Sequence, residues 1–406
     1  MAHVKDLRKA MLGGSRGMPK RPGGGGDAFL LRKDYSAVSA SDYFGKARFI
    51  PVDGIDRLYL YETEISGEEA TNIPYLLFLH GGGYSGLTWA PVISQLSPMF
   101  TAEFGAVDLR GHGRSACENE MDLSTERVTE DLFQLVQKLN LGERSLILVG
   151  HSMGGAFAIH LSDKLQEESN INLAGLIVID VVEGSALESL SGMQHVLRNR
   201  PKEFQSLTSA IEWCVRSGQT RNADSARISM PGQLKLLNGD VPESTMIDEP
   251  EESEESSHPI PKSAGTSITC IQEEESDEGC FTDLVFPQRS TGSRMQAPVV
   301  VLEKYVWRID LKKTEPFWRG WFEGLSKKFL AVRAPKLLLL AGVDRLDKEL
   351  MVAQMQGKFQ MQVLSSVGHI VHEDAPDRVA EHIASFLARN KIIAATSTIP
   401  RLFPGC

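Results

Sequence analysis

The pentapeptide Gly150-His151-Ser152-Met153-Gly154 constrains the fold of this chain more than any other feature. It follows the apolar run 146–149 and precedes a segment, 154–165, whose apolar residues have helical spacing. In a Gly-x-Ser-x-Gly pattern the serine lies on a strained turn between a strand and a helix, where only glycine leaves room beside the neighbouring backbone. The pattern therefore predicts a strand, a tight turn that exposes the Ser152 hydroxyl, and a helix.

Other short apolar runs along the chain also end in turns and alternate with helical stretches. This alternation is typical of a mostly parallel sheet that is covered by helices on both faces. With the serine turn, it predicts an α/β-hydrolase fold, opened by antiparallel strands around 50–62. The predicted strands are 75–79, 105–109, 146–149, 175–180, 336–341 and 361–364, and the predicted helices are 123–139, 154–165 and 378–387.

Composition divides the chain into a flexible leader, 1–33, and one domain, 34–406. Within the domain we expect a helical cap at about 185–330, because the pattern there turns helical and irregular. Part of the cap, about 241–295, is rich in Ser, Glu and Pro and has few large apolar residues. Such a segment cannot bury enough surface to offset the entropy of ordering, so we expect a disordered acidic insert.

The formal net charge of −10 is concentrated in one segment. Residues 248–280 contain eleven acidic residues against Lys262 alone, so the rest of the chain is close to neutral. This distribution argues against nucleic-acid binding. No apolar run approaches the roughly 20 residues that span a bilayer, so we expect no membrane partner.

The leader and the cysteines indicate an intracellular protein. The leader has scattered basic residues without the apolar stretch of a secretory signal. The five cysteines are an odd number without metal-type spacing, which favours reduced thiols and indicates no metal site. We expect a cytoplasmic or nuclear location.

A serine hydroxyl needs a general base, and two histidines follow the last predicted strand. His369 lies directly after that strand in Val367-Gly368-His369, where the fold places its base, and His372 is three residues further on. We expect His369 to be the base and His372 to be a structural histidine.

The third catalytic group must be a carboxylate that orients the imidazole and stabilises its charged form. Asp180 ends the strand 176–179, and Asp344 follows the strand 337–341. Each lies at the carboxyl end of a strand, so the pattern alone favours neither.

The glycine run His80-Gly81-Gly82-Gly83 resembles the loop whose amides bind the oxyanion in hydrolases of this fold. Glycine allows the backbone to approach the substrate closely. We expect the amides of Gly81 and Gly82 to act together with that of Met153, the residue after the serine.

Together these residues resemble the protein phosphatase methylesterase family, over residues 34 to the end except the acidic insert. In that family the triad acid is the aspartate of the segment that here contains Asp180. The resemblance implies removal of the methyl ester from the C-terminal leucine of the type 2A protein phosphatase catalytic subunit, without metal or organic cofactor. It also implies that the chain binds the C-terminal tail and surface of that phosphatase. The similar segments are 150–155, 179–184, 211–213, 338–348, 357–363, 372–377 and 403–406.

Two other functions fit parts of the same pattern. A general carboxylesterase acting on small esters would use the same residues, and it would have a wide apolar cap pocket. A non-catalytic phosphatase-binding protein would not need an intact set of Ser, His and Asp. An epoxide hydrolase or dehalogenase is disfavoured, because those enzymes have a carboxylate where this chain has Ser152.

Overall fold

The computed structural model describes residues 33–64, 73–247, 304–394, 396–400 and 402. They belong to one compact unit, Met1–Glu249 with Glu303–Cys406. The second unit, Pro250–Leu302, lies outside the described residues, as does the predicted leader apart from Lys33. No helix in the part of the chain that the structure describes has the length and apolar character needed to cross a membrane.

The central sheet has eight strands in the order β1-β2-β4-β3-β5-β6-β10-β11. β1 and β2 pair antiparallel and β2 joins β4 antiparallel, while the remaining pairs in this sheet are parallel. This is the mostly parallel sheet with an antiparallel opening that the sequence predicts. The strands are β1 (Lys46–Asp53), β2 (Asp56–Glu62), β3 (Tyr75–Leu79), β4 (Glu103–Asp108), β5 (Leu146–His151), β6 (Leu173–Ile179), β10 (Lys336–Leu340) and β11 (Gln360–Val363).

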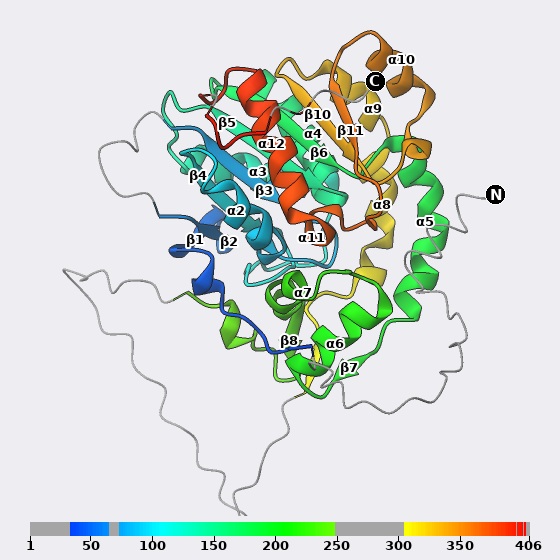
Figure 1. Cartoon of the computed structure of the whole chain (residues 1–406). Helices are drawn as coiled ribbons and strands as arrows, with labels where there is room; N and C mark the ends of the chain where they lie inside the picture. The colour runs from blue at the N-terminus through cyan, green and yellow to red at the C-terminus, as the bar shows by residue number, and fades with distance from the viewer. Residues whose placement is uncertain (1–32, 65–72, 248–303, 395, 401, 403–406) are drawn as a thin grey trace, which may run out of the picture. The chain divides into compact units, whose positions relative to one another are not determined.

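Helices cover both faces of this sheet (Figure 1). Successive side chains of β3 enter two different apolar cores: Leu77 contributes to one and Phe78 to the other. One core is closed by α3 (Thr125–Lys138), α4 (Met153–Glu168) and α9 (Leu325–Ala331), and the other by α2 (Ala90–Leu96) and α12 (Pro376–Arg389). The predicted helices 123–139, 154–165 and 378–387 correspond to α3, α4 and α12. Shorter elements on this part are η1 (Ala40–Asp42), η3 (Gly86–Trp89), η7 (Val343–Arg345), α10 (Lys348–Met355) and α11 (Val371–Asp374).

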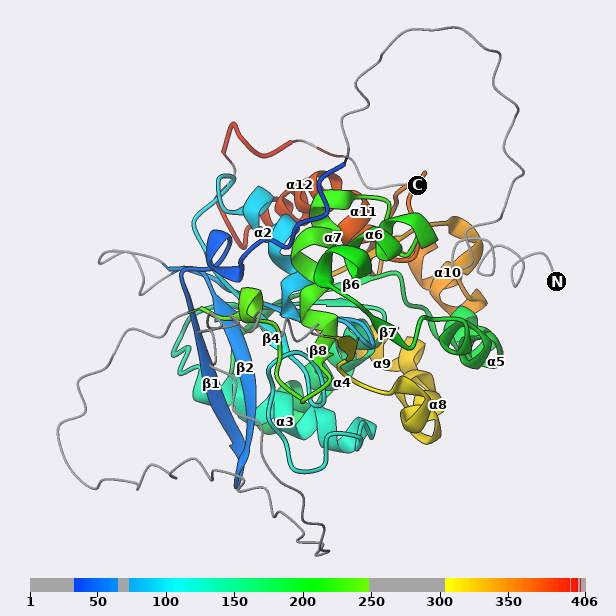
Figure 2. The same ribbon diagram turned by 90° about the horizontal axis from the view of Figure 1, so that it is seen from below.

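Between β6 and β10 the chain leaves the sheet and forms the layer in which the sequence predicts a cap. Figure 2 shows α5 and α8 side by side at the edge of this layer. The layer also contains a three-stranded antiparallel sheet, ordered β7-β9-β8, which the sequence analysis did not anticipate. Its elements are α5 (Glu183–Arg198), β7 (Glu203–Phe204), α6 (Leu207–Ser217), α7 (Ala223–Ser229), η4 (Pro231–Gln233), β8 (Leu234–Leu236), η5 (Glu243–Thr245), β9 (Tyr305–Trp307), η6 (Leu311–Thr314) and α8 (Glu315–Phe322).

The small sheet was not predicted from the sequence because its strands are only two or three residues long. Such strands are too short for an alternating pattern to be recognised. They are held by aromatic packing: the rings of Phe204, Trp213 and Trp307 have their centroids 5.6 Å apart in each pair. An aromatic cluster of this kind adds about 1 kcal/mol per pair beyond the buried area.

The first residues of the predicted acidic insert, 241–247, are described, and most of the rest lies outside the described residues. Thr245 and Ile247 are buried. The Tyr61 hydroxyl donates a hydrogen bond to the Thr245 carbonyl at 3.1 Å. The start of this segment therefore packs on the domain, because it supplies an apolar side chain and a backbone acceptor that composition alone does not reveal.

Candidate active site

Ser152 lies at a sharp turn between β5 and α4. Its backbone has φ 53° and ψ −121°, a conformation that is costly for a residue with a side chain. A Cβ on Gly150 would lie 2.3 Å from the Gly154 carbonyl oxygen, and one on Gly154 would lie 2.3 Å from the Leu79 carbonyl oxygen. Both glycines are therefore required by backbone packing, and the turn has the geometry that the pentapeptide predicts.

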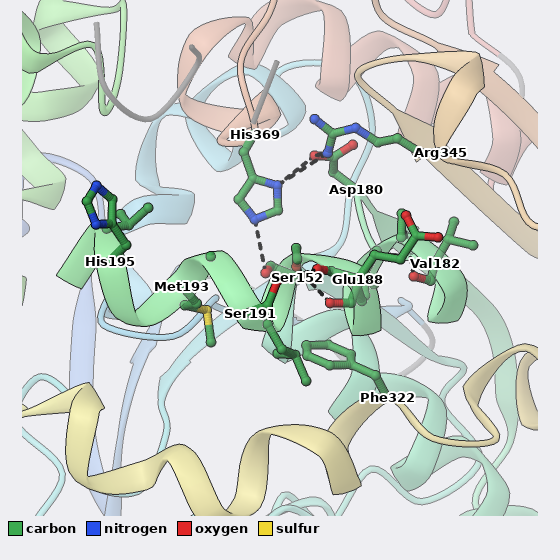
Figure 3. Close-up of a pocket in the computed structure, with 17 residues that line it drawn as sticks. Ser152, Asp180, Val182, Glu188, Ser191, Met193, His195, Phe322, Arg345 and His369 are labelled. Carbon is green, nitrogen blue, oxygen red and sulfur yellow. Dashed lines mark hydrogen bonds and ion pairs between the residues drawn. The ribbon is translucent and has the colours of Figure 1, made fainter. Parts of the chain in front are cut away.

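His369 lies in the loop between β11 and α11 and faces Ser152 (Figure 3). The two side chains are joined by a hydrogen bond of 3.1 Å between His369 Nε2 and Ser152 Oγ. The other ring nitrogen, Nδ1, lies 2.7 Å from Asp180 Oδ2. With the proton on Nδ1, the imidazole donates to Asp180 and accepts from the Ser152 hydroxyl.

Asp180 follows β6, and its side chain is fully buried. Burial alone would raise the pKa of this carboxyl, but the hydrogen bond from His369 and the charge of Arg345 outweigh it. The Ala341 amide also donates to Oδ1 at 2.9 Å, so the pKa of Asp180 lies below its ordinary value. Asp180 is thus held as a carboxylate beside the imidazole. The side chain of Asp344, the alternative acid, lies outside the described structure, and its backbone belongs to η7.

His372 is buried and contacts residues other than Ser152. Its Nε2 lies 2.8 Å from the Thr88 hydroxyl, and its ring stacks on Trp89 with the centroids 4.2 Å apart. Burial keeps the pKa of His372 well below its ordinary value. The structure therefore brings His369, and not His372, to within hydrogen-bonding distance of Ser152.

Three further residues support the base and the acid, and sequence reasoning missed all three. His151 donates from Nε2 to the His369 carbonyl at 2.9 Å, and burial lowers its pKa to about 3, so it stays neutral. Asp374 Oδ2 accepts from the Gly368 amide at 2.6 Å, next to the base. Arg345 forms an ion pair with Asp180. Only Arg345 carried a signal, since it lies at the carboxyl end of a predicted strand.

The glycine loop lies against the serine turn. A Cβ on Gly81 would lie 3.4 Å from Ser152 Cβ, and one on Gly82 would lie 3.6 Å from Met153 Sδ. Met153 is the first residue of α4, where a helix leaves its amides without intrahelical acceptors. The Gly83 amide is already used, because it donates to His112 Nε2 at 2.9 Å. The arrangement leaves Gly81, Gly82 and Met153 as the neighbouring candidates for an oxyanion site.

Two cavities meet at Ser152 and His369, and both are bounded by the layer between β6 and β10. The first, here called the α5 cavity, has a volume of about 210 Å³ and is shown in Figure 3. The second, here called the tryptophan cavity, has a volume of about 310 Å³. The α5 cavity is lined among others by Ser185, Ala186, Glu188, Met193, Phe322 and Arg345, and the tryptophan cavity by Tyr84, Arg200, Trp213, Gln219, Trp318 and Trp321.

This arrangement can carry out acyl transfer from an ester or a similar carbonyl compound. It has a nucleophile, a base within hydrogen-bonding distance, and a carboxylate that orients the base. The described residues contain no group of three or more His, Cys, Asp or Glu side chains placed to hold a metal ion.

Comparison with known proteins gives consistent results. The sequence model described as the alpha/beta hydrolase family matches residues 76–382. Protein phosphatase methylesterase 1 of Mus musculus is 42% identical over 98% of this chain and 99% of its own length, and the Homo sapiens protein has the same identity and coverage. The probable protein phosphatase methylesterase 1 of Caenorhabditis elegans is 39% identical over 89% of this chain and 80% of its own length.

Solved structures share the fold at low sequence identity. E-2-(acetamidomethylene)succinate hydrolase superposes with a TM-score of 0.56 at 18% identity, covering 84% of this chain and 98% of that protein. An esterase of M. tuberculosis gives a TM-score of 0.52 at 21% identity, with coverage of 84% and 91%. These likenesses support the α/β-hydrolase fold that the sequence predicts.

Proposed function

Because this chain belongs to the α/β-hydrolase family and, within it, to the protein phosphatase methylesterases, we propose that it demethylates the C-terminal leucine of the type 2A protein phosphatase catalytic subunit. The chain is an esterase, and this reaction would release methanol and a free carboxylate. The observation that carries the proposal is the line of hydrogen bonds from Ser152 through His369 to Asp180, placed where two cavities meet.

In the first half of the reaction Ser152 is the nucleophile. Its hydroxyl is a weak nucleophile at neutral pH, so His369 Nε2, 3.1 Å away, takes the proton as Oγ attacks the ester carbonyl. The imidazolium that forms is stabilised by the buried carboxylate of Asp180 at 2.7 Å.

The negative charge that develops on the ester oxygen is held by backbone amides. Gly81 and Gly82 pack against the serine turn, and Met153 begins α4, whose N-terminal end carries partial positive charge. Loss of one such donor typically slows a hydrolase by 10²–10³-fold. The His112 side chain contributes indirectly, because it anchors the Gly83 end of the loop.

The second half of the reaction frees the phosphatase tail. His369 gives its proton to the departing methoxide, which leaves as methanol, and the acyl group remains on Ser152. A water molecule then enters, His369 removes its proton, and the resulting hydroxide attacks the acyl carbon. Collapse of this intermediate releases the C-terminal carboxylate and restores the Ser152 hydroxyl.

The size of the cavities supports a substrate whose bulk lies on the acyl side. Methanol has a single carbon and needs little space, whereas the two cavities have volumes of about 210 and 310 Å³. Their lining includes Met193, Val196 and Phe322, which border both cavities near Ser152 and suit an apolar side chain such as leucine.

The partner in this proposal is the type 2A catalytic subunit, bound through its C-terminal tail and through its surface. The support is that the Mus musculus and Homo sapiens relatives are named protein phosphatase methylesterase 1. The location proposed with it is the cytoplasm or the nucleus, which agrees with the cysteine pattern of the sequence.

A second candidate is a carboxylesterase acting on small apolar esters. The observation that favours it is the aromatic lining of the tryptophan cavity by Trp213, Trp318, Trp321 and Phe322. Such a lining suits small apolar ligands as well as leucine.

The test is methanol release from carboxymethylated type 2A catalytic subunit, measured beside hydrolysis of a short-chain aryl ester. The wild type should release methanol, and Ser152→Ala should not. Ser185→Ala is the matched control, because Ser185 lines the α5 cavity but is not at the serine turn, and it should keep most of the activity. Turnover of the aryl ester without demethylation would favour the second candidate.

A further inference from the structure

The tryptophan cavity contains one unpaired cation. Among the residues that line it there is no Asp or Glu, and Arg200 is the one Lys or Arg. Arg200 forms no hydrogen bond or ion pair with any residue that the structure describes. Its guanidinium lies over the ring of Trp307, with 4.8 Å between the Arg200 Cζ atom and the ring centroid.

Two buried arginines of the described structure, in contrast, have carboxylate partners. Arg110 is paired with Asp131 at 2.7 Å, and Arg308 is paired with Glu120 at 2.5 Å. Burial lowers the pKa of Arg200, which reflects the cost of removing this cation from water. A partly buried cation without a carboxylate is stabilised when an anion enters the cavity.

Contacts of the glycine loop set an upper limit on the distance between the Arg200 guanidinium and Ser152. A Cβ on Gly83 would lie 3.6 Å from Arg200 Nη1, and a Cβ on Gly81 would lie 3.4 Å from Ser152 Cβ. Since consecutive Cα atoms are 3.8 Å apart, the guanidinium is at most roughly 18 Å from Ser152. An extended peptide covers this distance in about five residues.

We propose that Arg200 binds the carboxylate of an acidic side chain that lies within five residues upstream of the ester in the peptide substrate. This inference rests on the proposed function, since it takes the acyl part of the substrate to be a peptide. The carboxamides of Asn199 and Gln219 also line the tryptophan cavity, but their nitrogens already bond to His195 and Gln233, each at 3.1 Å, so Arg200 is the group that would bind the anion. The cavity thereby selects acidic peptides and not only a C-terminal leucine ester.

The experiment compares hexapeptides that end in leucine methyl ester. One series carries a single Asp at each upstream position in turn, and the matched series carries Asn at the same positions. Affinity is measured by calorimetry with the Ser152→Ala variant, so that no turnover is needed. At one or two positions the Asp peptide should bind about tenfold or more tightly than the Asn peptide.

Arg200→Met in the Ser152→Ala background should remove this preference and leave the affinity for Asn peptides nearly unchanged. Arg198→Gln is the matched control, because Arg198 is exposed, ends α5 and does not line the tryptophan cavity. That variant should keep the preference. Arg200 packs on Trp307, so Arg200→Met could disturb the local structure. The comparison of Asp and Asn peptides in the protein that retains Arg200 tests the inference independently of this effect.

Equal affinity for Asp and Asn peptides at every position would overturn the inference, as would a preference that persists in Arg200→Met. Failure of the proposed function gives a different result. In that case the wild type does not release methanol from the carboxymethylated phosphatase, whatever the affinities of the peptides for the Ser152→Ala variant.

Discussion

Replacing Asp180 by Asn should abolish most of the catalytic rate without unfolding the chain. The side chain of Asp180 is fully buried, with Oδ2 2.7 Å from His369 Nδ1 and Oδ1 2.9 Å from the Ala341 amide. Asn has the same shape and can still accept from Ala341. It cannot provide the negative charge that stabilises the imidazolium in the transition state.

The size of the effect follows from the charge separation. The centres of an imidazolium and a carboxylate joined by such a bond are about 4 Å apart, and at an effective dielectric constant of 20 their attraction is about 4 kcal/mol. Each 1.4 kcal/mol corresponds to about a factor of ten in rate, so kcat should fall about 10³-fold. Arg345 increases the loss, because its cation, 3.5 Å from His369 Nδ1, then repels the imidazolium of the transition state without the Asp180 charge to offset it.

The assay is steady-state hydrolysis of an aryl ester and of the methylated phosphatase, with kcat and KM determined separately. KM should change little, because Asp180 does not need to contact the substrate. Thermal unfolding should establish that the variant is folded. Asp344→Asn is the comparison, and it should retain activity within a few-fold. Equal losses at the two aspartates in folded proteins, or a loss below tenfold in Asp180→Asn, would refute the reasoning.

Three further predictions concern stability and the positioning of the base. Gly154→Ala should lower the free energy of unfolding, measured in urea, by at least about 3 kcal/mol, because the new Cβ would lie 2.3 Å from backbone. Gly192→Ala is the control: its Cβ would have nothing within 4 Å, so it should be neutral or slightly stabilising. Burial raises the pKa of Glu373 from 4.5 to about 7, so the folded state binds this proton more tightly, and the stability that it contributes below pH 4.5 is lost as the pH rises through 7. Between pH 4.5 and 7.5 the free energy of unfolding of the wild type should therefore fall by about 3 kcal/mol relative to that of Glu373→Gln. The same dependence of the unfolding free energy on pH in both proteins would contradict this. Asp374→Asn should lower kcat about tenfold with little change in KM, because it weakens the 2.6 Å hydrogen bond that holds Gly368 next to the base. An unchanged kcat would show that the loop is held in place without the Asp374 carboxylate.

The regular part of the fold could be predicted because its signals are local. The runs 75–79 and 146–149 are apolar and fully buried, since helices cover both faces of the sheet there. The small sheet β7-β9-β8 could not be predicted, because strands of two or three residues carry no periodicity and pair across large separations in the chain.

For the candidate site, the sequence by itself determined the serine turn. Gly150 is required by backbone contacts within the turn, whereas Gly154 is required by the backbone at the end of β3, so the pentapeptide reports a turn that the neighbouring strand also constrains. The place of His369 after the last strand was predictable for a similar reason, because chain order and strand ends locate the catalytic edge of the sheet.

Only the tertiary structure decided which side chains meet at that edge. Asp180 and Asp344 both follow strands, and the contact with His369 depends on β6 lying between β5 and β10. The ion pair of Arg345 and the unpaired state of Arg200 likewise depend on residues far away in the sequence. The physical reason is that charges and hydrogen bonds act through space over a few ångströms, and a sequence pattern reports only the backbone conformation of neighbouring residues.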